Sequence, residues 1–474
     1  MRRGLAFLTT VLLGAAPLGA APNPYEAARA GTPIMQATVT AAAHDDYRLE
    51  LALGADAPVW IFLRSGTARD TGASWRATSW HVLTDGVTLT RIGHHEALVA
   101  DDGGALPREI EIAFTPYEGL IHADYQPAIR LGEDVTALFS DHFTLRPAAS
   151  IAAVQALGAD WTMLPDYPGG HPLVRFEGED FNSGTRHGDF ALQNAAYVFH
   201  GTPKPRTSDQ LVMQVHPDLP LWLADQLAAD IPDILALYAA RLGPHEDERP
   251  ELIVGWGGPT RGTVSLGGSV IAHQIVMRLE GEMLVSPSPA AAAQARQFIA
   301  HEAAHFWLGN LVDYGPPGEA WTMEGGADLM ALRAAQAVDP AMAARLETRT
   351  LRASERECRR LGAGGPLVTA PERGAAQAFY GCGLLFSLLA EAAAVDAGGD
   401  FFTFWSGLIA RHGGDGTVSV EEWLDHYRAI GGDPATAARI HDLAFNRGVD
   451  GPLLDALFAA SKPARPASNG EAAS

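Results

Sequence analysis

Positive charge is scarce in this 474-residue sequence. Lysine and arginine together number 34, against 56 aspartates and glutamates, and the formal net charge at pH 7 is −22. Nucleic-acid binding depends on basic side chains that neutralise phosphates, and an anionic membrane surface repels an acidic protein for the same reason. The composition therefore predicts no nucleic-acid partner and disfavours attachment to an anionic membrane surface.

Cysteine is almost absent. Only Cys358 and Cys382 occur, and they do not form a CxxC motif. This excludes the usual arrangements for redox catalysis and for a cysteine-rich zinc knuckle. The two cysteines either form a disulfide in an oxidising compartment or remain as two buried thiols. A disulfide between them would stabilise the fold by about 3 kcal/mol in the chain-entropy model.

Long hydrophobic runs are missing except at the N-terminus. There Arg2 and Arg3 precede an apolar run from Leu5 to about Leu13, followed by small residues that resemble a cleavage site. The run is too short to span a bilayer comfortably. We expect a signal peptide over residues 1–21, export to the periplasm or the medium, and no membrane span after its removal. An uncleaved anchor is the alternative.

The rest of the sequence has a globular composition, with 47% hydrophobic and 19% charged residues, and its length predicts two or three domains. Residues 22–206 contain short alternating stretches separated by Gly, Asp and Pro, which predict an N-terminal domain resembling an antiparallel β-sandwich. Residues 207–460 begin with a predicted helix that ends at Gly243, a plausible C-cap. A few strands follow, and after Pro289 the pattern predicts almost continuous helices. Residues 461–474 are small and polar and predict a disordered tail. The predicted fold class is α+β and multidomain.

The segment HEAAH, at residues 301–305, is the strongest chemical signal. We expect it on a helix over 290–312, where His301 and His305 lie on one face and can offer two imidazoles to one metal ion. Glu302 then projects beside the metal, where its carboxylate can take a proton from an activated water. The alternative is one polar turn of an ordinary helix.

A third metal ligand follows after eighteen intervening residues, at Glu324. Catalytic zinc takes three protein ligands and keeps one open position. A turn at 316–318 and a returning helix would bring Glu324 alongside the two histidines. A solvated glutamate near a helix start is the alternative.

These residues resemble the signature of the membrane alanyl aminopeptidase family, gluzincins with HExxH, eighteen residues and then Glu. The positions that agree in register are Trp307, Gly309, Asn310, Leu311, Trp321 and Gly325. The resemblance runs from about Leu211 to Gly432. It implies a thermolysin-like, mainly helical catalytic domain and one Zn²⁺ ion, with His301, His305 and Glu324 as ligands and Glu302 as general base.

The family also places a tyrosine in a Tyr-x-x-Gly segment of a helix, where the hydroxyl stabilises the oxyanion. Tyr380 and Gly383 have this relation. A phenol can donate a hydrogen bond to developing negative charge, so the resemblance implies a catalytic role for Tyr380. An ordinary aromatic at the edge of the core is the alternative.

The sequence departs from the family at the strand that binds substrate. The family carries Gly-x-Met-Glu-Asn, whose glutamate binds the free α-amino group. Here the corresponding stretch is 262–268, with Ser265 and Leu266 in place of Glu and Asn. We expect the backbone around Ser265, Gly267 and Gly268 to bind an extended peptide. Serine carries no charge to pair with an ammonium group, which brings exopeptidase specificity into question.

The family usually continues into a large helical-repeat domain that caps the site, and here little follows Gly432. A more open cleft is expected, which would admit larger or internal peptides. Glu319 and Asp328 are candidate outer partners of the histidines, or simple surface residues.

Together these features predict an exported zinc metallopeptidase that acts on peptide or protein substrates. Two alternatives belong to other classes. One is a non-catalytic protein that binds peptide or glycan and retains zinc for structure. The other is a zinc hydrolase of a non-peptide substrate. The sequence does not indicate an oligomeric state.

Overall fold

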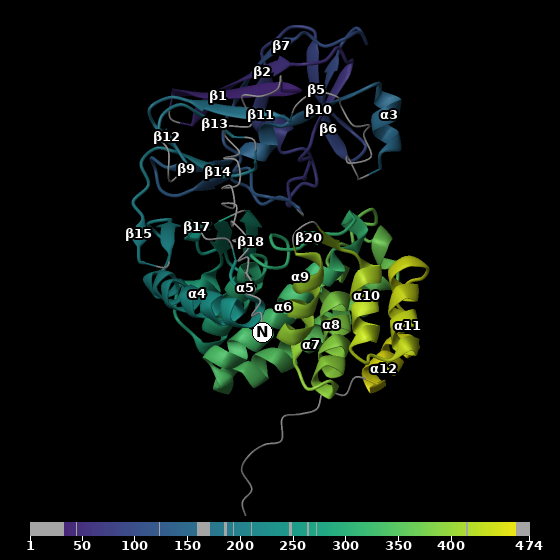
Figure 1. Ribbon diagram of the computed structural model, residues 1–474. Helices are drawn as coiled ribbons and strands as arrows, with labels where there is room; N and C mark the ends of the chain where they lie inside the picture. The colour runs from purple at the N-terminus through teal and green to yellow at the C-terminus, as the bar shows by residue number, and fades with distance from the viewer. Residues whose placement is uncertain are drawn as a thin grey trace, which may run out of the picture.

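The structure is a computed structural model, and it shows a β-rich N-terminal part above a mainly helical C-terminal part (Figure 1). It describes residues 33–43, 45–122, 124–158, 171–183, 187–192, 194–209, 211–245, 249–262, 265–271, 273–413 and 416–460. The predicted signal peptide, 1–21, and the predicted tail, 461–474, lie outside these residues.

Three sheets make up the described N-terminal part. The first has the order β13 (Phe190–Leu192), β11 (Leu173–Glu177), β1 (Met35–Ala43), β2 (Asp46–Leu53), β7 (Glu109–Phe114), β4 (Trp80–Val82). The second has the order β10 (Leu145–Ala148), β3 (Val59–Phe62), β6 (His95–Ala100), β5 (Val87–Ile92), and the third β12 (Phe181–Asn182), β14 (Tyr197–His200), β9 (Thr136–Phe139), β8 (Ala128–Arg130). Pairing in these described sheets is antiparallel, as the alternating sequence predicts, except for the parallel pair β1–β11. The short helices here are α2 (Arg76–Ser79), η1 (Ser140–Phe143) and α3 (Ile151–Ala156).

A five-stranded mixed sheet begins the second part. Its order is β15 (Arg206–Thr207), β16 (Val212–Val215), β17 (Glu251–Trp256), β19 (Gln274–Glu280), β18 (Ser265–Ile271). β18 is antiparallel to β19 and ends the order, so its outer edge has no partner strand within the described chain. The helix α4 (Leu221–Leu242) stops at Gly243, whose φ of +94° suits glycine, as the sequence predicts. The predicted boundary between the two domains, at residues 206 and 207, stays a prediction.

Helices dominate after this sheet. They are α5 (Pro289–Ala304), α6 (Trp321–Val338), α7 (Pro340–Gly362), α8 (Ala378–Asp396), α9 (Phe401–His412), α10 (Val420–Ala429), α11 (Pro434–Phe445) and α12 (Gly451–Ala460). Short 3₁₀ segments are η3 (Glu282–Leu284), η4 (Pro317–Glu319) and η5 (Leu367–Thr369), and β20 (Asp313–Tyr314) pairs with β21 (Thr417–Val418). Ser419 and Glu422 form a capping box at the start of α10.

The prediction of one helix over 290–312 is wrong at its C-terminal end, because α5 stops at Ala304. The next amides, of Phe306 and Trp307, bond to carbonyls three residues back, which tightens the turn. Gly309 then has a φ of +133°, which an α-helix cannot accommodate. His305 is therefore the C-cap of α5 and remains one turn after His301.

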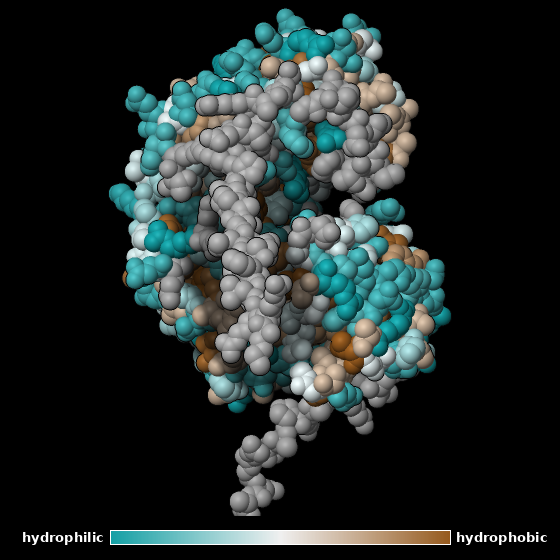
Figure 2. All heavy atoms as spheres, viewed as in Figure 1, coloured by the Kyte–Doolittle hydropathy of each residue, from teal (hydrophilic) through white to brown (hydrophobic). Residues whose placement is uncertain are grey.

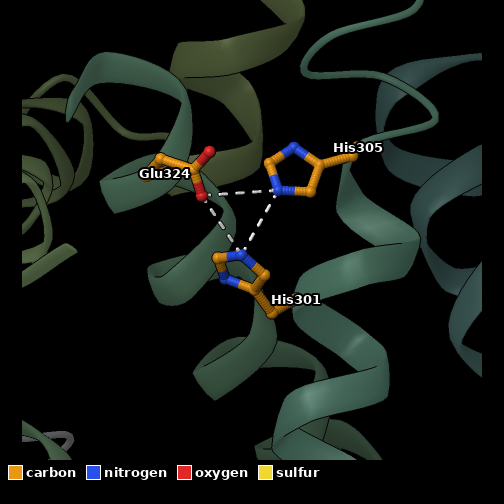
Figure 3. Close-up of side chains that lie close together, drawn as sticks. All are labelled: His301, His305 and Glu324. Carbon is orange, nitrogen blue, oxygen red and sulfur yellow. Dashed lines mark hydrogen bonds and ion pairs between the residues drawn. The ribbon is translucent and has the colours of Figure 1, made fainter. Parts of the chain in front are cut away.

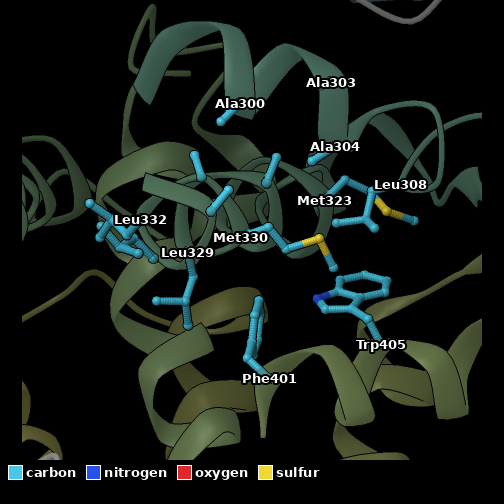
Figure 4. Close-up of a cluster of buried hydrophobic side chains, with 14 of the residues drawn as sticks. Ala300, Ala303, Ala304, Leu308, Met323, Leu329, Met330, Leu332, Phe401 and Trp405 are labelled. Carbon is cyan, nitrogen blue, oxygen red and sulfur yellow. The ribbon is translucent and has the colours of Figure 1, made fainter. Parts of the chain in front are cut away.

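The helical core is apolar around α5 and α6. Small side chains of α5, such as Ala300, Ala303 and Ala304, let α6 approach closely, and Met330 and Trp405 fill the space beyond (Figure 4). The helix α8 is the one described helix whose length and apolar composition would suit a membrane span, yet 78% of its most apolar window is buried in the molecule. Cys358 of α7 and Cys382 of α8 form a disulfide between the two helices, which settles the alternative left open above.

A separate apolar cluster joins the two parts. It contains residues of β8, β9, the turn between them and β14 on one side, and of β17 to β19 on the other: Ile129, Leu131, Val135, Ala137, Phe139, Tyr197, Phe199, Ile253, Ile271 and Val276. The buried Gln274 amide accepts from the Tyr197 N–H at 2.9 Å and donates to the Tyr197 carbonyl at 3.2 Å. The five-stranded sheet is thus fixed to the β-rich part. The space-filling view shows an indentation between the upper and lower parts of the molecule (Figure 2).

Candidate metal site

Two adjacent helices bring the three predicted ligands together. His301 lies in the last turn of α5, His305 is its C-cap, and Glu324 lies in the first turn of α6. The side chains point toward one another from the two helices (Figure 3). All three are largely withdrawn from solvent, with 7% of His301 and 8% of His305 exposed.

The three potential ligand atoms form a nearly equilateral triangle. His301 Nε2 lies 3.2 Å from His305 Nε2, and Glu324 Oε2 lies 3.4 Å from the first nitrogen and 3.6 Å from the second. Zinc–ligand bonds of about 2.0–2.1 Å in a tetrahedron place neighbouring ligand atoms about 3.3 Å apart. The triangle therefore has the size of one face of a tetrahedral zinc site.

Hydrogen bonds on the far side of each imidazole set the tautomers. His301 Nδ1 lies 2.9 Å from Asp328 Oδ1, and His305 Nδ1 lies 2.8 Å from the Leu308 carbonyl oxygen. Both acceptors require Nδ1 to carry the proton, so each Nε2 presents its lone pair to the centre of the triangle. Asp328 is thus an outer partner of His301, one of the two roles considered for it.

Electrostatics in the site favour a cation. Burial works to raise the pKa of Glu324, but His305 and His301 hold that pKa well below its usual range. Burial works to lower the pKa of His301, and the carboxylates of Asp328, Glu324 and Glu302 together outweigh it and raise that pKa. Among the described residues, buried Glu324 Oε2 has no hydrogen-bond partner. A buried carboxylate oxygen aimed at two nitrogen lone pairs fits a divalent metal ion, which replaces the protons.

Glu302 lies next to the triangle and under the edge strand of the sheet. The side chain is buried, and burial raises the pKa of its carboxyl group, although His301 and His305 oppose the shift. An ideal Cβ built on Gly268 of β18 would lie 2.5 Å from the Glu302 carboxyl carbon. The absence of a side chain at Gly268 therefore lets β18 pass directly over Glu302.

Tyr380 comes to the site on α8. Its ring centroid lies 5.7 Å from that of His301. The charge of Glu324, and then burial, raise the pKa of Tyr380 well above its usual value, which keeps the phenol protonated as a donor. Two glycines allow this placement, because a Cβ on Gly325 of α6 would lie 2.0 Å from the Gly383 carbonyl carbon of α8.

The three predicted substrate-binding residues all lie on β18, the edge strand. Ser265 begins the strand opposite Glu280 of β19, and Gly267 and Gly268 follow opposite Arg278 and Met277. Of these, Gly268 is the one that abuts Glu302. Residues 263 and 264 of the predicted motif lie outside the described chain.

The interpretation of Glu319 as an outer partner of the histidines is wrong. Its Oε2 accepts from the Val420 N–H at 2.7 Å, so Glu319 ties the turn before α6 to the start of α10.

Tyr314 is a residue of the site that the sequence did not predict. Its hydroxyl donates to Glu324 Oε1 at 2.9 Å, and no spacing rule in the sequence connects it to the ligands.

Neither a protein-family model nor a curated protein sequence matches this chain. Solved structures do. An aminopeptidase N family protein from Idiomarina loihiensis has a TM-score of 0.56 at 13% identity, over 89% of this chain and 78% of that one. Leukotriene A4 hydrolase from Saccharomyces cerevisiae has a TM-score of 0.50 at 12% identity, over 89% of this chain and 68% of that one. At such identities the likeness shows a shared fold and nothing further about this chain.

Proposed function

We propose that this chain is an exported zinc metallopeptidase that hydrolyses peptide bonds. One Zn²⁺ ion is held by His301, His305 and Glu324. The observation that carries the proposal is the triangle of ligand atoms with sides of 3.2, 3.4 and 3.6 Å beside the buried carboxylate of Glu302. A purely structural zinc site closes its fourth position with another protein ligand and needs no adjacent base. The catalytic domain corresponds to residues 207–460, behind a β domain at 22–206.

Zinc held by the three ligands would supply a water molecule of lowered pKa as nucleophile and a Lewis acid for the scissile carbonyl. Glu302 accepts a proton from this water as it attacks the carbonyl carbon. Glu302 then passes the proton to the departing nitrogen as the C–N bond breaks. The buried position of Glu302, directly beside the triangle of ligand atoms, suits both steps. Tyr380 donates a hydrogen bond to the carbonyl oxygen as negative charge develops on it.

The substrate lies in extended conformation along β18. No described strand pairs with the outer edge of β18, so an extended peptide can add there in the manner of β-augmentation. The sequence of β18 contains no carboxylate that could bind a substrate ammonium group. Internal peptide bonds are therefore substrates alongside N-terminal ones. The same absence favours a second candidate function, hydrolysis of a non-peptide substrate.

The disulfide between Cys358 and Cys382 supports export, because such bonds persist in oxidising compartments such as the periplasm and the extracellular medium.

This function is tested with the purified full-length protein and its Glu302→Gln variant. Each is incubated with matched peptides whose N-termini are either free or blocked. The wild type should cleave both sets, and a chelator should abolish cleavage. Glu302→Gln should keep zinc and lose turnover by at least about 10²-fold, since a general base contributes at least that much. A fully active Glu302→Gln variant contradicts the assignment. Cleavage restricted to free N-termini contradicts the proposed substrate range, and zinc binding without any cleavage favours the alternatives.

A further inference from the structure

Tyr314 contacts two of the three ligand residues and has no role in the chemistry described above. It belongs to the two-residue strand β20, which pairs with β21. The amide of the preceding residue, Asp313, donates to the Gly416 carbonyl at 3.1 Å. The backbone at Tyr314 is therefore held by a segment about a hundred residues later in the chain, independently of α5 and α6.

The ring of Tyr314 contacts His305 and Gly309 on its inner side, although 36% of the residue is exposed. Its centroid lies 6.1 Å from that of the His305 imidazole, with 30° between the two planes. Gly309 makes room for it, because an added Cβ there would lie 3.0 Å from Tyr314 Cε2. Both contacts limit rotation of the ring, so the hydroxyl has a defined position.

The hydroxyl joins a ligand of α5 to a ligand of α6. It donates to Glu324 Oε1 at 2.9 Å and lies 3.2 Å from His305 Nδ1. The Nδ1–H of His305 points to the Leu308 carbonyl oxygen at 2.8 Å and is shared with the phenol oxygen. Proton donation then runs in one direction, from His305 to Tyr314 and from Tyr314 to Glu324.

This chain of hydrogen bonds decides which carboxylate oxygen faces the histidines. Oε1 is occupied by the phenol, and Oε2 is left toward the two Nε2 atoms without a hydrogen-bond partner among the described residues. We propose that Tyr314 is a positioning residue of the metal site, which fixes the rotation of the Glu324 carboxylate. This inference rests on the proposed function, because it assumes that the triangle holds zinc.

Loss of an outer hydrogen-bond partner of a metal ligand costs roughly 10–100-fold in metal affinity. Tyr314→Phe keeps the packed ring and removes the hydroxyl alone. We expect its zinc dissociation constant, measured by competition with a chromophoric chelator, to rise by about 10–100-fold over the wild type. Thermal unfolding of the metal-free proteins should coincide, because the ring contacts remain.

Two further variants make the test specific. Tyr427→Phe, a buried tyrosine of α10, should leave zinc affinity unchanged. Tyr380→Phe should lose turnover that excess zinc does not restore, whereas excess zinc should restore most turnover of Tyr314→Phe.

A Tyr314→Phe protein with zinc affinity within twofold of the wild type overturns the inference while leaving the proposed function intact. A wild type that binds no zinc overturns both.

Discussion

At the scale of single residues, spacing along the chain carries most of the information about the site. His301 and His305 are four apart, and one helical turn places them together wherever the helix ends. Glu324 is predictable because a turn and a second helix return the chain to the same place. Tyr314 was not predictable, since its contact with Glu324 depends on the pairing of β20 with β21 and on the packing of its ring on Gly309.

The contact between Gly268 and Glu302 leads to a prediction at the same scale. In Gly268→Ala, the new methyl group would lie 2.5 Å from the Glu302 carboxyl carbon, so the carboxylate must move. A displacement of about 1 Å in a catalytic group can cost about 10²-fold in rate. We expect kcat to fall by about 10–100-fold with zinc content unchanged.

Gly267→Ala is the matched control. A Cβ at Gly267 would meet its nearest neighbour, the Arg278 carbonyl oxygen, at 3.9 Å, which is an ordinary contact. An ordinary contact leaves Glu302 in place, so the kcat of Gly267→Ala should stay within about twofold of the wild-type value. A twofold change in rate corresponds to about 0.4 kcal/mol of activation free energy. Equal effects of the two substitutions on kcat would mean that β18 does not position Glu302.

At the scale of elements, the close approach of α6 and α8 links the metal ligand Glu324 to Tyr380. Gly325 and Gly383 face each other where the two helices meet, and neither has room for a side chain. The sequence indicated both glycines by register with the family, but their mutual contact is a property of packing. The premature end of α5 has a similar origin, because Gly309 and the tight turn after Ala304 override an apolar pattern that suits a longer helix.

Gly383→Ala tests this helix contact. The added Cβ would lie 2.3 Å from the Trp321 carbonyl oxygen, which is backbone and cannot rotate away. Overpacking of this kind costs typically about 1–3 kcal/mol. We expect the free energy of unfolding, from denaturant titration, to fall by about that amount, and kcat to fall because Tyr380 moves with α8.

Ser387→Ala, one turn further along α8, serves as the control. The serine is fully buried and its hydroxyl has no hydrogen-bond partner among the described residues, so its removal should be neutral or slightly stabilising. If Gly383→Ala unfolds at the same denaturant concentration as the wild type, the helices are not in the close contact described.

At the scale of the whole molecule, composition and periodicity were sufficient for the order of a β-rich part followed by a mainly helical part. They could not give the arrangement of the strands, because pairs such as β1 with β11 join residues far apart in sequence. They also could not give the apolar cluster around Tyr197 and Ile253 that joins the two parts. Both are long-range contacts for which alternation alone gives no register. The aminopeptidase N family protein and the leukotriene A4 hydrolase share the fold at 13% and 12% identity.

The stoichiometry of zinc in the purified full-length chain tests the central claim most directly. The zinc content is measured by elemental analysis of the wild type and of Glu324→Ala. We expect one zinc ion per wild-type chain and essentially none in the variant, because three ligands are needed to hold the ion. The Glu324→Ala protein should remain folded by circular dichroism. A wild type without zinc, or a folded Glu324→Ala protein that retains a full complement, would contradict a metal centre built from His301, His305 and Glu324.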